Sequence, residues 1–541
     1  MQKNYTASHH ESDVYQSWKE SGLFNPDVCA EQGYCTSGEN FSIVLPPPNV
    51  TGQLHLGHAA MAAFQDIMVR YHRMKGDKTL WLPGTDHAAI ATQSVVEKSL
   101  VDQGMPDRKE MGREKFLDHC WDWTHKYRDR INGQISAMGS SLDWSREKFT
   151  LDLEVSESVE NIFHDMYRDG LIYRGARMVN WCPKCESTLS DDEVDHKDVN
   201  GKMYHMLYEI QDFVPANTDQ KQNLIELNGK WHLTIATTRP ETLFGDTAVA
   251  VHPEDTRFNF LVGQKAVLPF IDRVIPIIGD DYVNMEKGTG CLKVTPGHDP
   301  NDYKIGQRHK LETINVFHDN AHLNEQAGKF ENVERFIARK QLIAELQAEG
   351  KIPEVKENPH SVGHCYRHGD TPIEPLVSPQ WFVDVNKPIA SRGNKSLKEL
   401  MLDAVRSGET ELVPDRFNKV YYNWIEDLED WCISRQIWWG HRIPVWYDHA
   451  GNICVDRALA EKEGYRQDED TLDTWFSSGL WPFSTLDGPK DTADMRDYFP
   501  NSVLETGHDI IFFWVARMIL MSTYALGKSP FKTVYMHGMV C

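Results

Sequence analysis

A run of three prolines constrains this chain more than any other feature. The prolines occupy positions 46–48, directly after the apolar run FSIVL at residues 41–45. Because proline has no backbone N–H to donate, a central strand has to end there. Apolar residues then recur every three to four positions over residues 64–74 and stop at Gly76, which predicts a helix with an apolar face. With a second apolar run at residues 79–82, this order predicts a doubly wound parallel α/β sheet.

The pattern changes twice along the chain. Two more helices are expected near residues 116–138 and 155–166, the second ending at Gly170. Short β-rich runs then dominate residues 203–294, and Trp-rich α/β character returns from about residue 375. We therefore expect an α/β catalytic domain split by an inserted, mostly β domain. The expected boundaries are 1–40 for an N-terminal extension, 41–194 for the first half, 195–360 for the insertion and 361–541 for the second half.

Bulk properties exclude several classes of protein. The net charge of -23, from 57 Lys+Arg and 80 Asp+Glu, argues against a generally basic surface for nucleic acid, so a polyanionic partner would need local charge and shape. Residues 510–521 form the best membrane candidate, but Arg517 interrupts them and they are shorter than the roughly 20 residues of a spanning helix. The amino end has no signal-peptide pattern, and ten scattered cysteines form no disulfide framework. We expect a cytoplasmic protein.

The sequence His55-Leu56-Gly57-His58 lies between the proline-ended strand and the predicted helix. The amino end of a helix offers free N–H groups and a positive dipole to phosphate, and Gly57 allows close approach. Two histidines three residues apart can both donate to phosphate oxygens as charge develops. A bare His-x-x-His is more often a surface pair or half of a metal site, so the interpretation depends on the surrounding string.

That string, PPPNVTGQLHLGHA, resembles the HIGH motif of class I aminoacyl-tRNA synthetases. Its first part, PPPNVTG, is more similar to the valine enzymes than to the isoleucine or leucine ones. Further blocks look like those of the valyl-tRNA synthetase family: GTDHAAIATQ, LDWSRE, DWCISRQIWWGHRIPVWY, DEDTLDTWFSSGLWPFSTL and TGHDIIFFWVARM. The resemblance covers nearly the whole chain. It implies ATP-dependent activation of valine to valyl-adenylate, with Mg²⁺ accompanying ATP, and transfer of the valyl group to tRNA(Val).

The resemblance also implies residue roles. Asp86 should hold the substrate ammonium, because a charged group in an apolar pocket needs an opposite charge. Taken alone, Asp86 also suits a helix N-cap, and each tryptophan suits core packing. The valine pocket implied by the resemblance comprises Pro46, Pro47, Asp86, Trp475, Ile510 and Trp514. The implied ATP site comprises Asn49, Gly57, Gly507, His508 and Asp509, with His55 and His58 as the catalytic pair.

Valine and threonine have nearly the same shape. An apolar pocket rejects the added hydroxyl only by about 10²-fold, a value known for the valine enzymes themselves, so a second, hydrolytic site is expected. The segments TTRPET (237–242) and GTGCLKVTPGHDPND (288–302) look like editing segments of the valine, isoleucine and leucine enzymes.

In this resemblance Asp302 binds the α-ammonium of a misattached residue, while Asp299, with Lys293 and Thr295, reads the threonine hydroxyl. Arg239 and Thr242 position the tRNA 3′ end and the attacking water. By itself, Asp-x-x-Asp in a Gly/Pro-rich loop is ordinary turn chemistry. The full expected editing set is Thr237, Thr238, Arg239, Thr242, Lys293, Thr295, Asp299 and Asp302.

Two short pairs suggest a metal site. Cys182 and Cys185 form a Cys-x-x-Cys, and Cys365 and His368 follow about 180 residues later, on the other side of the insertion. Four such ligands would close a tetrahedral structural Zn²⁺ site. Some relatives have two cysteine pairs and others lack the site, so the fourth ligand stays open. The competing histidines are His196, His360 and His364; without metal, the cysteines are simply reduced thiols.

The family pattern includes a lysine-rich KMSKS loop, followed by a helical anticodon-binding domain. Neither occurs in these 541 residues, so we expect a truncated amino-terminal portion with slow adenylate formation, because that loop stabilises the pyrophosphate leaving group. Three alternatives remain: an editing-only hydrolase of Thr-tRNA, a non-catalytic tRNA-binding fragment, and a sister enzyme for isoleucine. The expected partners are tRNA(Val), valine and ATP, for a monomer that does not bind membranes.

Overall fold

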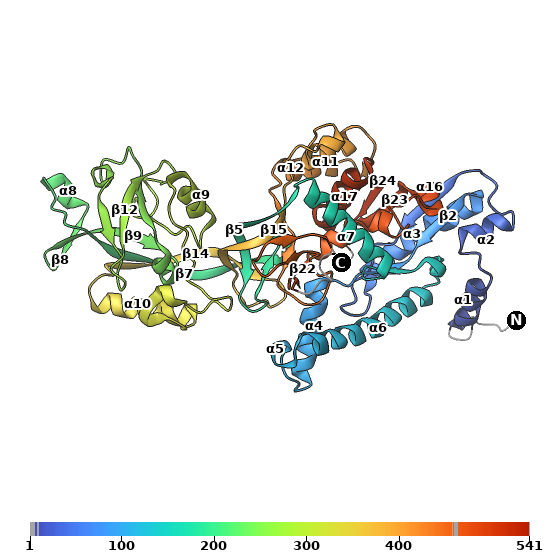
Figure 1. The fold of residues 1–541 in the computed structure, drawn as a ribbon, viewed down its shortest axis with the longest axis horizontal. Coiled ribbons are helices and arrows are strands. Elements are labelled where there is room, and N and C mark those ends of the chain that lie inside the picture. Colours follow the sequence, from blue (N-terminus) through green and yellow to red (C-terminus); the bar gives the residue numbers. More distant parts are fainter. Residues whose placement is uncertain (1–5, 8–9, 457, 459–463, 540–541) are drawn as a thin grey trace. The chain divides into compact units, whose positions relative to one another are not determined.

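The computed structural model describes residues 6–7, 10–456, 458 and 464–539. The chain forms two compact units (Figure 1): a split unit, Met1–Arg174 with Trp381–Cys541, and an inserted unit, Gly175–Gln380. The inserted unit begins within strand β5 (Ile172–Cys182) and ends within strand β15 (Glu374–Val383). It therefore extends beyond the expected insertion, residues 195–360, at both ends. The change in composition marks the start of the β-rich runs, whereas the chain enters the insertion earlier, along a strand.

The split unit contains the doubly wound parallel sheet, as predicted. Its strand order is β16-β24-β23-β1-β2, and all four neighbouring pairs are parallel. β1 ends at Val44, immediately before Leu45 and the prolines, and its last four residues are buried. The strands are β1 (Asn40–Val44), β2 (Lys78–Leu82), β16 (Glu411–Val413), β23 (Asn501–Gly507) and β24 (Phe531–His537).

Helix α3 (Leu56–Lys75) follows β1 and ends at Gly76, whose φ of 85° is the left-handed conformation that glycine adopts easily. The expected apolar face is not the buried one: Phe64, Ile67, Tyr71 and Met74 are exposed. Met61, Ala62, Gln65 and Val69 are buried instead. Small side chains let the helix approach its neighbours, and Gln65 is satisfied by accepting from Trp81 (2.9 Å) and donating to Glu505 (3.0 Å).

The other predicted helices of this unit are present as α6 (Arg113–Ala137) and α7 (Leu153–Arg168). The stretch His508–Leu526 is long and apolar enough to cross a membrane by length and composition, but 67% of its most apolar window is buried, as in a core helix. It comprises a 3₁₀ turn, a π turn and α17 (Ala516–Leu526). Further helices are α1 (Glu11–Glu20), α2 (Pro26–Glu31), α4 (Ala89–Asp102), α5 (Arg108–Met111), α11 (Leu397–Arg406), α12 (Phe417–Glu426), α14 (Thr474–Ser478), α15 (Trp481–Ser484) and α16 (Ala493–Tyr498).

The inserted unit is mostly β, as the sequence pattern predicted. Its eight-stranded sheet has the order β13-β10-β12-β11-β7-β9-β8, with β14 paired to β7 along its whole length. A second core of apolar side chains fills this unit. Its elements are β7 (Val194–Ile210), β8 (Ile225–Leu227), β9 (Lys230–Thr237), β10 (Ala248–Val251), β11 (Lys265–Val267), β12 (Val274–Gly279), β13 (Cys291–Val294), β14 (Glu354–Cys365), α8 (Thr218–Gln222), α9 (Pro300–His309) and α10 (Arg335–Ala348).

Candidate functional sites

A cavity of ≈ 410 Å³ opens where β1 ends and α3 begins. All six residues expected to bind valine line it, together with Asn49, His55 and His58. This is the carboxyl edge of the parallel sheet, where folds of this type bind ligands. Gly52, a glycine of the nucleotide motif, also lines the cavity, and the lining residues that were not expected are Pro48, Thr51, Gln53, Leu54 and Ser478.

Among the residues that the structure describes, Asp86 is the one acidic residue that lines this cavity, and it is 4% exposed. Its carboxylate accepts hydrogen bonds from Ala88 N (2.6 Å), Thr474 Oγ1 (3.1 Å) and Ser478 Oγ. Burial raises the pKa of Asp86 despite these donors. A carboxylate has about four acceptor positions, so three donors leave room for one cation. The helix-cap alternative does not hold, because α4 has Ala88 as its N-cap.

Proline and tryptophan side chains form the apolar walls of this cavity. Pro46 is buried, and Trp514 is 2% exposed with its indole N–H donating to Ser478 O at 3.0 Å. Trp475 is half-buried opposite a neighbouring ring, Phe513 (6.4 Å between centroids). Proline rings and a hydrogen-bonded indole move little, so this cavity can measure the size of a small branched side chain.

The two histidines cap α3 reciprocally. His55 Nδ1 accepts from Gly57 N (3.1 Å), and His58 Nδ1 accepts from His55 N (3.3 Å). Because both Nδ1 atoms accept, each neutral ring carries its proton on Nε2, where it can donate to an anion. Burial, followed by the neighbouring His55, lowers the pKa of His58 to about 4. A Cβ at Gly57 would lie 2.9 Å from the His55 ring, so a larger residue here would displace that ring.

The remaining residues of the expected ATP site lie outside the lining of this cavity. Gly57 is in the first turn of α3, while Gly507 ends β23 and His508 and Asp509 form the next turn. His508 Nδ1 lies 3.2 Å from His537 O at the end of β24. Since β23 neighbours β1, the structure brings these residues to the same sheet edge.

The inserted unit has its own cavity, of ≈ 580 Å³. All eight residues of the expected editing set line it, so β9 with the turn that follows, and β13 with α9, supply one site. Other lining residues are Met203, Ala236, Tyr282, Val283, Asn284, Lys287, Gly288, Thr289, Gly290, Cys291, Leu292, His298 and Asn301.

Lys293 forms the centre of a buried polar network in this cavity. Its Nζ donates to Thr242 Oγ1 (3.0 Å), to Asp246 Oδ1 (2.9 Å) and to Thr295 Oγ1. Asp246 is fully buried and also accepts from Tyr208 OH at 2.6 Å. Sequence reasoning missed Asp246, although a buried lysine requires a carboxylate and this one lies four residues after Thr242.

The two aspartates of the Asp-x-x-Asp segment differ in their surroundings. Asp299 is the N-cap of α9, accepts from Asn301 N (2.8 Å) and Asp302 N (3.1 Å), and also lines the cavity. Asp302 is 6% exposed, and its Oδ2 accepts from Thr295 N at 2.8 Å. Burial, followed by the charge of Asp299, raises the pKa of Asp302 to about 7.

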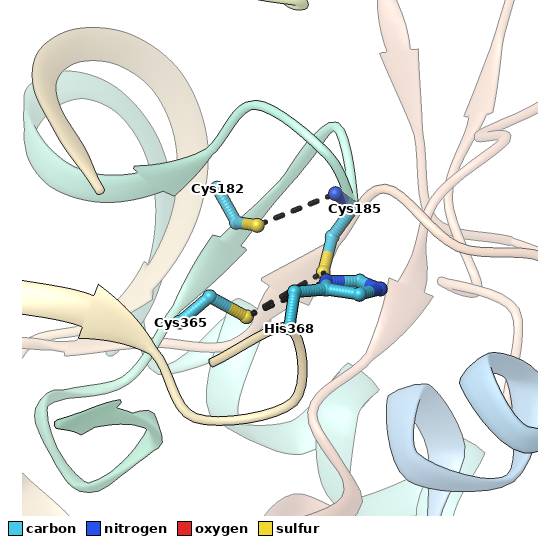
Figure 2. Close-up of side chains that lie close together, drawn as sticks. All are labelled: Cys182, Cys185, Cys365 and His368. Atoms are coloured by element: carbon cyan, nitrogen blue, oxygen red, sulfur yellow. Dashed lines mark hydrogen bonds between the residues drawn. The ribbon is translucent and has the colours of Figure 1, made fainter. Parts of the chain in front are cut away.

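Four metal-ligand side chains converge in the inserted unit, as Figure 2 shows: Cys182, Cys185, Cys365 and His368. Their ligand atoms all lie within 4.8 Å of one another. Cys185 Sγ is 3.9 Å from Cys365 Sγ and 3.3 Å from His368 Nδ1. Around a tetrahedral zinc with ligands at about 2.0–2.3 Å, ligand atoms lie roughly 3.5–3.8 Å apart, so this set fits that ion.

The competing histidines do not join this cluster. His360 Nδ1 and His364 Nδ1 lie 2.8 Å and 2.9 Å from backbone oxygens of their own strand, β14, and His196 is exposed on β7. His368 is the histidine that the fold brings to the three cysteines.

The split unit thus combines a parallel α/β sheet, a histidine-capped helix at its carboxyl edge and a buried carboxylate in the adjoining cavity. Residues 13–461 and 453–541 match the family model described as tRNA synthetases class I (I, L, M and V). The chain belongs to this family.

The chain is also similar, over nearly its whole length, to several valine–tRNA ligases. The chain is 48% identical over 547 residues to the valine–tRNA ligase of Thermotoga maritima, covering 100% of this chain and 59% of the relative. It is 48% identical over 543 residues to that of Carboxydothermus hydrogenoformans, covering 99% and 58%. It is 46% identical over 547 residues to that of Clostridium acetobutylicum, covering 100% and 58%. The chain thus spans less than two thirds of the length of these relatives.

Proposed function

We propose that this chain carries the amino-acid-activating site of a valine–tRNA ligase, together with its editing site. The observation that carries the proposal is the split-unit cavity, in which Asp86 is the acidic residue between proline and indole walls. Such a cavity accepts an ammonium and a small branched side chain while excluding longer ones by overlap.

The proposed reaction joins valine to ATP. The valine carboxylate attacks the α-phosphate, which needs positioning and charge stabilisation more than acid–base chemistry. The Nε2–H groups of His55 and His58 are suited to donate to phosphate oxygens at the amino end of α3. Mg²⁺ would accompany the ATP phosphates. The valyl group then passes to tRNA(Val).

The proposed editing reaction hydrolyses Thr-tRNA(Val) in the inserted-unit cavity. Asp302 would bind the α-ammonium, while Lys293, Thr295 and Asp299 would read the threonine hydroxyl. Polar groups that a hydroxyl satisfies are left unpaired by valine, which gives discrimination that an apolar pocket lacks.

The test compares amino acids and tRNA esters on the same protein. We expect ATP–pyrophosphate exchange with valine, about 10²-fold weaker exchange with threonine, and none with isoleucine. We also expect Thr-tRNA(Val) to be deacylated faster than Val-tRNA(Val). Deacylation without exchange would indicate an editing-only hydrolase. Activity in neither assay would indicate a non-catalytic tRNA-binding fragment. Preference for isoleucine would indicate the sister enzyme.

We also propose that the Cys/His cluster holds a structural zinc ion. Purified protein should contain one zinc per chain. Cys365→Ser should lose it and lower the melting temperature of the inserted unit by on the order of 10 °C, because structural zinc contributes folding energy. His368→Ala should also lose the metal, whereas His364→Ala should retain it. Full zinc content in His368→Ala would exclude His368 as a ligand.

A further inference from the structure

Glu374 is a buried carboxylate next to the inserted-unit cavity that does not belong to the expected editing set. It is the first residue of β15 and is 1% exposed. It does not line the cavity, but it contacts two residues that do, Arg239 and His298.

Charges of alternating sign surround Arg239. Glu374 accepts from Arg239 Nη2 through Oε1 and from Arg335 Nη1 through Oε2 (2.6 Å). On the other side, Arg239 Nε lies 3.7 Å from Glu241, which receives two hydrogen bonds from Arg339 (2.5 and 2.6 Å). Three guanidinium groups and two carboxylates therefore alternate, with Arg239 in the middle.

These contacts fix the guanidinium plane of Arg239. Its Nη1 donates to His298 O at 2.8 Å, so all three nitrogens face protein partners. The side chain nevertheless stays 28% exposed at the cavity. Its guanidinium group is therefore a positive charge in a fixed position. Such a charge is suited to binding the anionic end of a tRNA.

His298 also lies close to Glu374. Because His298 Nε2 accepts from Val316 N (2.9 Å), its ring proton is on Nδ1, which lies 3.6 Å from Glu374 Oε1. Burial alone would raise the pKa of Glu374, but Arg239, His298 and Arg335 hold it well below its usual range. The carboxylate is thus an anion that accepts hydrogen bonds from two guanidinium groups.

We infer that Glu374 is a positioning residue for the proposed editing reaction, acting by holding the Arg239 guanidinium at the cavity. The inference rests on the proposed editing function. Glu374 touches no substrate in this account; its effect passes through Arg239.

The experiment measures kcat and KM for Thr-tRNA(Val) deacylation in Glu374→Gln, Arg239→Ala and the double variant. A misplacement of about 1 Å can cost about 10²-fold in rate, so we expect kcat/KM of Glu374→Gln to fall by about that factor, mostly through KM. The double variant should be no slower than Arg239→Ala alone, because coupled residues are not additive. Additive losses would overturn the inference.

Arg335→Met is the matched control. It breaks the same buried network at the other oxygen of Glu374, but Arg335 does not line the cavity. It should lower the melting temperature as Glu374→Gln does, yet change deacylation by less than about 3-fold; an equal loss of deacylation would show a purely structural role.

If Glu374→Gln does not fold, Glu374→Asp keeps the charge and withdraws it by one methylene, and the same cycle applies. Wild-type protein without deacylation would overturn the editing function itself, whereas wild-type deacylation that Glu374→Gln leaves unchanged overturns this inference alone.

Discussion

Asp86→Asn is expected to weaken the binding of valyl-sulfamoyl-adenosine, an unreactive analogue of valyl-adenylate, by about 10²- to 10³-fold. The substitution keeps the size of the side chain, and an amide oxygen can still accept from Ala88 N and Thr474 Oγ1. It removes the charge that pairs with the substrate ammonium, and an uncompensated buried charge costs about 3–5 kcal/mol. Titration calorimetry measures the effect without requiring catalysis.

The matched control is an analogue without the amine, 3-methylbutanoyl-sulfamoyl-adenosine. Wild type and Asp86→Asn should bind it equally, because only the ammonium needs Asp86. Ser478→Ala, which removes one donor to the carboxylate, should cause a smaller loss for the valyl analogue. Undiminished binding of the valyl analogue by Asp86→Asn would show that the ammonium sits elsewhere.

Asp302→Asn is expected to lower the deacylation of Thr-tRNA(Val) by about 10²- to 10³-fold. The amide can still accept from Thr295 N, so the local fold should persist. The loss arises because the α-ammonium of the ester enters a buried position without its anionic partner. Release of threonine from labelled Thr-tRNA(Val), corrected for spontaneous hydrolysis at each pH, measures it.

The same variant has a distinct pH signature. The pKa of Asp302 is raised to about 7, first by burial, so the neutral acid dominates below that pH and cannot pair with an ammonium. Wild-type kcat/KM should therefore rise through pH 7 and fall once the substrate amine, with an ordinary pKa of about 8, loses its proton. Asp302→Asn should lack the rising limb. N-acetyl-Thr-tRNA(Val), which has no ammonium, should react equally slowly with both proteins; a large difference between them would contradict the assigned role.

Much of the candidate chemistry was predictable because its signals are local. The prolines at 46–48 end a strand whatever surrounds them, and Gly76 stops α3 through its own backbone freedom. The contiguous strings that resemble family motifs supplied nine of the residues that line the split-unit cavity, and all eight residues of the expected editing set line the inserted-unit cavity. The placement of these residues follows from the fold, whereas their roles await the experiments described here.

Other features depended on partners far away in the chain. The exposed stripe of α3 has the same periodicity as a buried one, and only the neighbours of Gln65, including Glu505, decided which face is buried. Asp246 and Glu374 carry no motif of their own, since each matters through a cation, Lys293 or Arg239, that the fold brings to it. Only the three-dimensional structure distinguishes His368, which lies with the three cysteines, from His360 and His364, which contact backbone oxygens of their own strand.

The sequence by itself determined where strands and helices stop and which segments carry reactive groups, because backbone limits and short motifs act over a few residues. The tertiary structure decided which of those groups meet, which are buried and which charges are paired. These properties are set by desolvation and by contacts between residues up to several hundred positions apart, and no local pattern encodes them.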